Sequence, residues 1–156
     1  MIYSQVIKLL KEKSLTIGSI ESLTGGLFAA TITNYSGVSK VFRGSIVSYS
    51  TDVKKNVVGV SNETIQKYGV VSKECALEMA KKGQKLLETD IVVSFTGNAG
   101  PDAMENKEVG LVYIGLIYNQ DLDVFELKLS GSRENIRKEC VEFVFRKIFE
   151  KISRTF

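Results

Sequence analysis

The feature that most restricts the fold is a short apolar run in the second half of the chain, Ile91-Val92-Val93-Ser94-Phe95. A strand with one face in water alternates apolar and polar residues, whereas a strand buried on both faces is apolar almost throughout. The run therefore predicts a strand at the centre of a sheet. Since both faces of such a sheet must be covered, we expect helices on each side of it.

Helical and strand patterns alternate around this run. Apolar residues recur at helical spacing in residues 2–10 and, as a wide stripe, in residues 136–152. Further strand-like segments are residues 16–20, 45–49, 109–118 and 122–129, the last two joined by a turn at Asn119-Gln120-Asp121. Helix starts are indicated at Thr51 or Asp52, at Ser61 and at Ser72. The order predicts one domain, residues 1–156, built as a three-layer α/β/α sandwich whose mixed sheet includes an antiparallel hairpin.

Composition excludes several classes of protein. Of the 156 residues, 44% are apolar and 25% charged, and Pro101 is the only proline, so a disordered chain or a proline-rich linker is not expected. The net charge of +3 is spread without a basic stripe, which gives no support for nucleic-acid binding. Cys75 and Cys140 fit buried apolar positions better than a disulfide or metal pair. Without a signal peptide pattern or a long apolar run, we expect a soluble cytoplasmic protein that uses no membrane.

The chain contains no histidine, so serine or cysteine chemistry that depends on imidazole is excluded. A hydroxyl nucleophile nevertheless stands in the run Glu21-Ser22-Leu23-Thr24-Gly25-Gly26, at the carboxyl end of a predicted strand. Lys54, with Tyr49 beside it, is the candidate proton acceptor for Ser22. Each residue also has a simpler interpretation: Ser22 as a helix cap, Lys54 as a solvated lysine, and Tyr49 as a strand aromatic with its ring in the core.

Two glycine clusters follow predicted strands, where ligands collect in α/β sheets. Thr24-Gly25-Gly26 opens a helix whose free N–H groups suit an anion, although two glycines could also serve close packing alone. Thr96-Gly97-Asn98-Ala99-Gly100-Pro101-Asp102 brings polar groups to a strand end, as a simple turn or as a ligand wall. Arg133 begins the last helix, where a cation is slightly unfavourable, and this hints at an anionic partner.

Several separated motifs, in this order, are similar to those of the CinA carboxyl-terminal domain family. They are the run from Glu21 to Gly26, Tyr49-Ser50 with Lys54, Gly69-Val70-Val71-Ser72, the run from Thr96 to Asp102, Val109-Gly110, and Gly131-Ser132-Arg133 with Ile136-Arg137. Characterised members include nicotinamide mononucleotide deamidases. The resemblance implies an amidohydrolase that converts nicotinamide mononucleotide to nicotinate mononucleotide and ammonia. It assigns Ser22 as the nucleophile, assisted by Lys54 and Tyr49, with Arg133 in the site.

This chemistry requires neither a metal nor a cofactor, but it does require a neutral lysine. Lysine titrates near ~10.4, so Lys54 needs a pKa lowered by about two or three units, which partial burial and Arg133 could supply. We expect the N–H groups of Thr24, Gly25 and Gly26 to hold the oxyanion or the substrate phosphate. The remaining substrate-binding candidates are Thr96, Gly97, Gly100, Asp102 and Arg133. The alternative function is a nucleotide-binding or regulatory domain of the same fold without catalysis, and in either case a homo-oligomer is expected.

The sequence departs from the family pattern at three places. Leu23 stands where members commonly carry cysteine, a change we expect to be tolerated as apolar packing. Asn98 replaces a more usual apolar residue, and the loop at residues 103–108 is bulkier and more acidic than the usual glycine-rich one. Because this loop is expected to border the ligand, it could alter affinity or select another amide. Many relatives also carry an amino-terminal domain that has no counterpart in this sequence.

Overall fold

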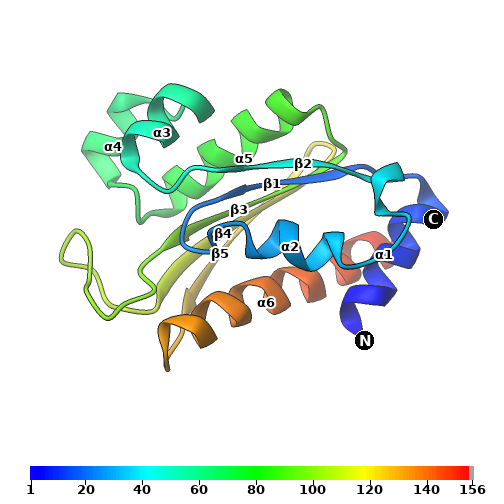
Figure 1. Cartoon of the computed structure of the whole chain (residues 1–156). Coiled ribbons are helices and arrows are strands. Elements are labelled where there is room, and N and C mark those ends of the chain that lie inside the picture. The colour runs from blue at the N-terminus through cyan, green and yellow to red at the C-terminus, as the bar shows by residue number, and fades with distance from the viewer. Residues whose placement is uncertain (155–156) are drawn as a thin grey trace.

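A five-stranded mixed sheet forms the centre of the protein (Figure 1). The structure is a computed structural model and describes residues 1–154. The strand order is β2-β1-β3-β4-β5, in which β1 pairs in parallel with β2 and β3, and β4 is antiparallel to β3 and β5. The strands are β1 (Ile17–Glu21), β2 (Phe42–Val47), β3 (Ile91–Gly97), β4 (Leu111–Tyr118) and β5 (Asp121–Lys128). The predicted mixed sheet and its hairpin are confirmed.

Helices cover both faces of the sheet (Figure 1). One face carries α1 (Ile2–Lys13), α2 (Leu27–Thr33) and α6 (Arg133–Ser153), with the short 3₁₀ helix η1 (Val38–Lys40) nearby. The other carries α5 (Lys73–Leu87), beside which lie α3 (Thr51–Val53), the π-helical segment η2 (Lys54–Val58) and α4 (Asn62–Tyr68). Each helical layer buries its own cluster of apolar side chains against the sheet. This arrangement is the predicted three-layer α/β/α sandwich.

The apolar run in β3 is the buried centre that its sequence predicted. Every residue from Ile91 to Phe95 is at most 1% exposed. The one polar member, Ser94, donates its hydroxyl to the carbonyl of Ala76 at 2.6 Å and accepts the N–H of Gly115 at 3.2 Å. The strand therefore carries no unsatisfied side chain into the core.

Helix α5 approaches the sheet most closely at Gly83. A Cβ at this position would lie 2.3 Å from Cγ1 of Ile20 in β1, far inside van der Waals contact. Only glycine leaves room for this contact, so Gly83 fixes the distance between α5 and β1. Since Ile20 is two residues before Ser22, the same contact supports the strand end from which the site is built.

Several helix starts match the sequence-based expectation. The hydroxyls of Ser61, Ser72 and Ser132 each accept the N–H of the residue three positions later, at 3.1–3.2 Å. The expected cap at Thr51 or Asp52 is wrong by one or two residues, because Ser50 caps α3 by accepting the N–H of Val53.

The second predicted strand is also displaced. β2 spans Phe42–Val47 instead of residues 45–49, because it pairs with β1 along its whole length and β1 ends at Glu21. Tyr49 therefore follows the strand, and its exposure of 57% contradicts a ring in the core.

Cys75 and Cys140 are buried and unpaired, as expected. Among residues 1–154, none of the helices combines the length and the apolar character that a bilayer crossing requires.

The topology gathers three strand ends at one edge of the sheet. Because β2, β1 and β3 run in parallel, the segments after their carboxyl ends lie side by side. These segments begin with Ser48, Ser22 and Asn98. The N-terminus of α6 reaches the same edge, since Arg133 contacts the loop after β3.

Candidate functional site

Ser22 directly follows β1 and points to Lys54, not to a helix end. The side chain is almost buried, with the residue 7% exposed. The N-cap of α2 is Gly26, four residues later, and no side chain caps that position. The interpretation of Ser22 as a helix cap is therefore wrong. Instead, the Oγ of Ser22 accepts a hydrogen bond from the Nζ of Lys54 at 2.9 Å.

Lys54 is a buried lysine, only 2% exposed. It begins the π-helical segment η2, directly after the short helix α3 that follows β2. Its Nζ lies 2.8 Å from the carbonyl oxygen of Ser48 and 3.2 Å from that of Tyr49, in addition to its contact with Ser22. The interpretation of Lys54 as a solvated helix lysine is therefore wrong.

The two carbonyls determine what the amine can do. A carbonyl oxygen only accepts hydrogen bonds, so Ser48 and Tyr49 take two of the amine's hydrogens. In the neutral amine these are the only hydrogens, and the lone pair is left facing the Oγ of Ser22. The hydroxyl then donates to the lone pair, which is the arrangement required for a lysine that removes a serine proton.

Burial lowers the pKa of Lys54 below its ordinary value, because the charged ammonium loses its water shell. Cys75 and Glu105 act in the opposite direction and only partly offset this effect. Burial raises the pKa of the Cys75 thiol to about 12, so this thiol is neutral near pH 7. The expected lowering is present with burial as its main cause, whereas Arg133 is not among its causes.

The turn after Ser22 is held by a buried carboxylate. Glu21, fully buried, accepts the N–H groups of Gly26 and Phe28 through Oε1, at 3.2 and 3.0 Å. Its Oε2 accepts the N–H of Ala29 at 3.1 Å and the hydroxyl of Ser19 at 2.9 Å. Glu21 thus satisfies the free N–H groups at the start of α2 from within the chain.

This carboxylate changes the expectation for the glycine turn. The N–H of Gly26 is bonded to Glu21, and the N–H of Gly25 donates to the carbonyl of Ser22 at 2.9 Å. The expected anion site at these two glycines is already filled, so it cannot take a ligand without breaking these bonds. Thr24 is fully buried, and its hydroxyl has no partner among the described residues.

Two backbone N–H groups closer to Ser22, those of Leu23 and Thr24, are available to a ligand. No described atom accepts from the N–H groups of Leu23 and Thr24. The carbonyls of the same two residues accept hydrogen bonds from Arg137 of α6. Its Nε donates to the carbonyl of Leu23 at 2.9 Å, and its Nη2 donates to the carbonyl of Thr24 at 2.8 Å. Arg137 therefore fixes the peptide group that carries the N–H of Thr24 and the one that carries the N–H of Gly25.

Sequence reasoning gave no separate role to Arg137 or Glu21, although both belong to the motifs described above. A signal for each was present. Arg137 lies four residues after Arg133, on the same side of a helix, and Glu21 places a charge at the end of an otherwise uncharged buried strand.

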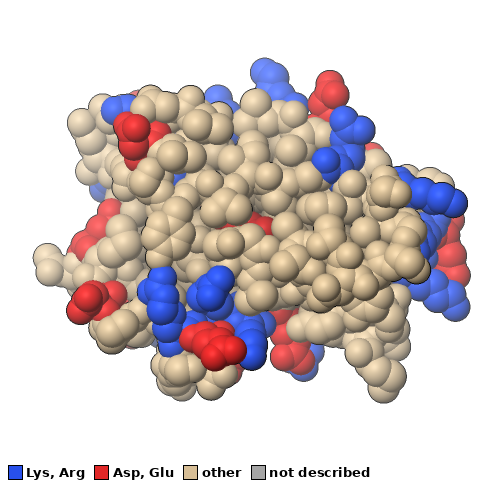
Figure 2. All heavy atoms as spheres, in the orientation of Figure 1, with Lys and Arg blue, Asp and Glu red and all other residues tan. Residues whose placement is uncertain are grey.

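Arg133 and Tyr49 meet at the rim of the site. The Nη2 of Arg133 donates to the hydroxyl of Tyr49 at 2.5 Å, and its Nη1 donates to the carbonyl of Gly100 at 2.7 Å. The hydroxyl of Tyr49 thus contacts Arg133, while its backbone carbonyl contacts Lys54. Figure 2 shows Lys and Arg side chains gathered over the start of α6. Tyr49 and Arg133 therefore form a positively charged bridge at the entrance.

A cleft of about 80 Å³ lies beside Ser22. The structure brings all three catalytic candidates to it, Ser22, Tyr49 and Lys54. Of the binding candidates, it brings Thr96, Gly97, Gly100, Asp102 and Arg133, whereas Thr24, Gly25 and Gly26 do not line the cleft. A cavity of about 660 Å³ exists between the β4–β5 turn and the end of α6, but it lies at the opposite end of the sheet.

The far wall of the cleft was not predicted in detail. It is formed by Val70 and Val71, and Asn98 and Met104 also line the cleft. Thr96 supports this wall, because its hydroxyl donates to the carbonyl of Val70 at 2.6 Å. In residues 1–154, no three His, Cys, Asp or Glu side chains gather closely enough to hold a metal ion.

Comparison with known proteins identifies the family. A family model described as the CinA C-terminal domain matches residues 1–152. The chain belongs to this family. The geometry above is therefore that of a CinA domain, and the resemblance found in the sequence motifs is confirmed.

Relatives of this CinA domain are named competence-damage inducible proteins. One from Bacillus mycoides is 47% identical over 152 residues, which are 97% of this chain and 37% of the relative. One from Bacillus subtilis is 52% identical over 133 residues, 85% of this chain and 32% of the relative. The chain thus spans about a third of the length of the curated relatives that it matches.

Solved structures share the fold over nearly the whole chain. A CinA superfamily protein from Klebsiella pneumoniae has a TM-score of 0.95 at 25% identity, covering 98% of this chain and 96% of its own. A competence/damage inducible protein from Agrobacterium tumefaciens has a TM-score of 0.91 at 30% identity, covering 96% of this chain and 92% of its own. These likenesses agree with the α/β architecture described above.

Proposed function

We propose that this CinA domain is an amidohydrolase that converts nicotinamide mononucleotide to nicotinate mononucleotide and ammonia. The observation that carries the proposal is the buried contact of 2.9 Å between Nζ of Lys54 and Oγ of Ser22. A buried lysine with a lowered pKa, directed at a serine beside a cleft, is an arrangement suited to nucleophilic catalysis. The choice of substrate rests on the family resemblance.

In the first half of the reaction, Lys54 takes the Ser22 proton while Oγ bonds to the carboxamide carbon. The carbonyl oxygen of the substrate becomes an oxyanion. When the tetrahedral intermediate collapses, the carbon–nitrogen bond breaks and Lys54 gives its proton to the departing nitrogen, which leaves as ammonia. An ester between Ser22 and the nicotinoyl group remains.

In the second half, water attacks the ester and Lys54 takes one of its protons. Collapse of the second intermediate breaks the bond to Oγ, and Lys54 returns the proton to Ser22. The product is the carboxylic acid, and the enzyme regains its starting protonation state. The carbonyls of Ser48 and Tyr49 keep the amine in place through both halves.

The N–H groups of Leu23 and Thr24 are the best-placed donors for the oxyanion. They are the first two N–H groups after the nucleophile, Leu23 lines the cleft, and no described atom accepts from either N–H. In α/β-hydrolases the residue after the nucleophile supplies such a donor, and losing one oxyanion donor typically costs ~100-fold or more in rate. Arg137 supports the Thr24 donor, because it binds the carbonyl of Leu23 on the opposite side of the same peptide group.

The cleft is large enough to enclose only part of the substrate. Ligand pockets commonly measure ~300–1,000 Å³, whereas this cleft measures about 80 Å³. The enclosed space suits a carboxamide group, so the ribose and phosphate would lie outside, near the rim. Arg133, with the hydroxyl of Tyr49, is the cation closest to that position and would serve the phosphate.

The second candidate is a nucleotide-binding or regulatory domain without turnover, for which the Arg133–Tyr49 contact at the rim is the supporting observation. Both candidates use the rim, but only the amidohydrolase needs Ser22 and Lys54. Ammonia release from nicotinamide mononucleotide separates them. We expect turnover by the parent protein, with a loss of at least ~10³-fold in Ser22→Ala and Lys54→Met.

Lys55→Met is a matched control, because Lys55 is the exposed neighbour of Lys54. It should keep the parental rate. Turnover that survives in Ser22→Ala would refute the serine mechanism, and folded parent protein that binds the nucleotide without releasing ammonia would favour the binding domain.

A further inference from the structure

The loop between β3 and β4 is organised around one buried amide, Asn98, which is only 2% exposed. Its Nδ2 donates to the carbonyls of Met104, Lys107 and Glu108 at 3.2–3.3 Å, and its Oδ1 accepts the N–H of Met104 at 3.1 Å. The loop is therefore folded onto Asn98 as a unit, although it lacks the glycines usual in the family.

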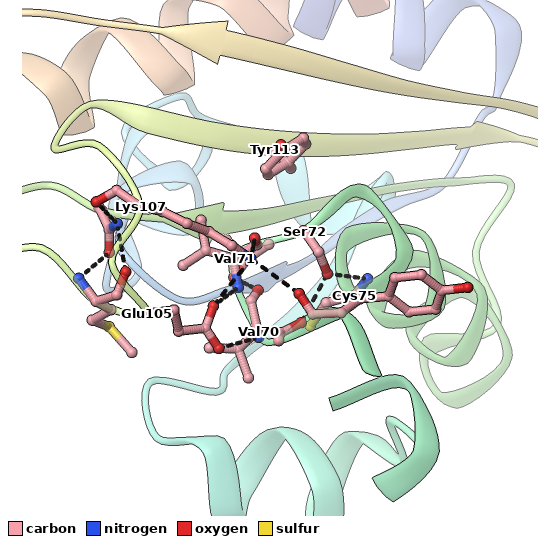
Figure 3. Close-up of polar contacts among 12 residues, drawn as sticks. Val70, Val71, Ser72, Cys75, Glu105, Lys107 and Tyr113 are labelled. Atoms are coloured by element: carbon pink, nitrogen blue, oxygen red, sulfur yellow. Dashed lines mark hydrogen bonds and ion pairs between the residues drawn. The ribbon is translucent and has the colours of Figure 1, made fainter. Parts of the chain in front are cut away.

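Glu105 connects this unit to the far wall of the cleft. Its carboxylate accepts the N–H groups of Val70 and Val71, each at 2.9 Å (Figure 3). Lys107 reaches the same segment, donating to the carbonyls of Tyr68 and Val71, and pairs with Glu105 at 3.4 Å. The two side chains thus join the loop to residues 68–71 from both sides.

The charge on this carboxylate is stabilised by its contacts. Burial alone would raise the pKa of Glu105, but the N–H groups of Val71 and Val70, together with Lys107, hold that pKa below its ordinary value. The neighbouring backbone is adapted to it as well. Gly69 has φ of +80°, and a Cβ there would lie 2.4 Å from the carboxylate.

The segment that Glu105 holds lines the same cleft as Ser22 and Lys54. Val70 and Val71 line the cleft and are 4% and 1% exposed. Both backbone polar groups of Val70 are bonded, its N–H to Glu105 and its carbonyl to the hydroxyl of Thr96. The position of this wall sets how much room the cleft offers above the nucleophile.

We propose that Glu105 is a positioning residue that sets the width of the cleft and thereby the size of the acyl group that Ser22 accepts. This inference rests on the proposed function, since it concerns the same nucleophile. The pair Glu105–Lys107 holds this wall through bonds to the backbone of Tyr68, Val70 and Val71. The predicted consequence is a narrow selectivity for planar carboxamides.

The test uses Glu105→Gln, which keeps the side-chain volume but cannot accept two N–H groups with a single charged carboxylate. Glu108→Gln is the matched control, because it removes an exposed carboxylate from the same loop. Lys107→Met is a second variant that leaves the Glu105 carboxylate on the wall. Folding of all variants is compared by thermal unfolding.

The first readout is the rate at which Ser22 reacts with two sulfonyl fluorides, methanesulfonyl fluoride and the bulkier phenylmethanesulfonyl fluoride. In Glu105→Gln the rate with the bulky reagent, divided by the rate with the small one, should rise roughly tenfold. This factor corresponds to about 1.4 kcal/mol in activation free energy. Lys107→Met should raise the ratio by less, and Glu108→Gln should leave it at the parental value.

The second readout is turnover of nicotinamide mononucleotide, where Glu105→Gln should raise KM more than it lowers kcat. A folded Glu105→Gln protein with the parental reagent ratio and the parental KM overturns the inference about Glu105. If the parent releases no ammonia, the proposed function fails, and the reagent ratio still decides the role of Glu105.

Discussion

Replacement of Glu21 by glutamine tests whether a buried carboxylate holds the turn that carries the nucleophile. Glutamine has the same shape, and its Oε1 can keep the bonds from Gly26 and Phe28. Its NH₂ group, however, replaces the oxygen that accepts the N–H of Ala29. The NH₂ group of the glutamine and the N–H of Ala29, both donors, then face each other at the start of α2.

The magnitude follows from these contacts. A hydrogen bond to a charged group contributes ~1.5–3 kcal/mol, and a buried donor left without an acceptor costs ~1–3 kcal/mol. Because the side chain is fully buried, we expect Glu21→Gln to lower the free energy of unfolding by about 2–4 kcal/mol. For a chain of this length, each kcal/mol corresponds to about 2–4 °C in Tm.

Glu63→Gln provides the comparison. Glu63 also lies in the first turn of a helix, α4, but it is exposed, and its loss should cost only ~0.3–1 kcal/mol. The assay is urea unfolding followed by circular dichroism, with Tm as a second measure. If Glu21→Gln loses no more stability than Glu63→Gln, the bonds to Glu21 do not hold the turn, and the argument is refuted.

Three further predictions concern the reaction and the packing beneath it. Because burial lowers the pKa of Lys54 and the neutral amine is the base, kcat/KM should rise with pH through an apparent pKa below 10.5; a limb at or above 10.5 would contradict this. Arg137→Met should lower kcat roughly tenfold to a hundredfold at similar KM, because Leu23 and Thr24 lose their anchor, while unchanged kcat in steady-state assays would remove that role. Gly83→Ala should lower the free energy of unfolding by ~1–3 kcal/mol through the contact with Ile20, and denaturant curves like those of the parent would contradict the packing argument.

The contact between Ser22 and Lys54 could be predicted because it depends on regular structure. Both residues follow strands, and neighbouring parallel strands end at the same edge of a sheet. The strand pattern, the glycine turn and the lysine after the next strand made the pair a candidate, and the family resemblance favoured it over a helix cap and a solvated lysine. The displacement of β2 by a few residues left this outcome unchanged, because Lys54 lies in the segment after the strand in either case.

The contacts of the irregular segments could not be predicted in the same way. Glu105 bonds to backbone groups 34 and 35 residues earlier, from a loop in which Glu105 and Asn106 both have positive φ. Neither a helical nor a strand period describes such a loop, so nothing in the local pattern indicates the partner. The anion site expected at Gly25 and Gly26 failed for a related reason, since the glycine pattern is the same whether an internal carboxylate or a ligand occupies the N–H groups.

The burial that lowers the pKa of Lys54 should also lower the free energy of unfolding at pH values where the unfolded chain carries the charged amine. The pH dependence of that free energy therefore tests the lowered pKa. The folded protein favours the neutral amine, while the unfolded chain keeps a pKa near 10.5. Between the lowered folded value and 10.5, the unfolded state binds more protons, so stability must rise with pH in that window and the cost is largest below it. Lys54→Met has no amine to titrate. The difference in free energy of unfolding, parent minus Lys54→Met, should therefore increase from neutral pH toward 10.5 in urea titrations at matched ionic strength. A difference that stays constant across the window would mean that Lys54 holds its proton as firmly in the folded protein as in water, and such a lysine could not remove the proton of Ser22.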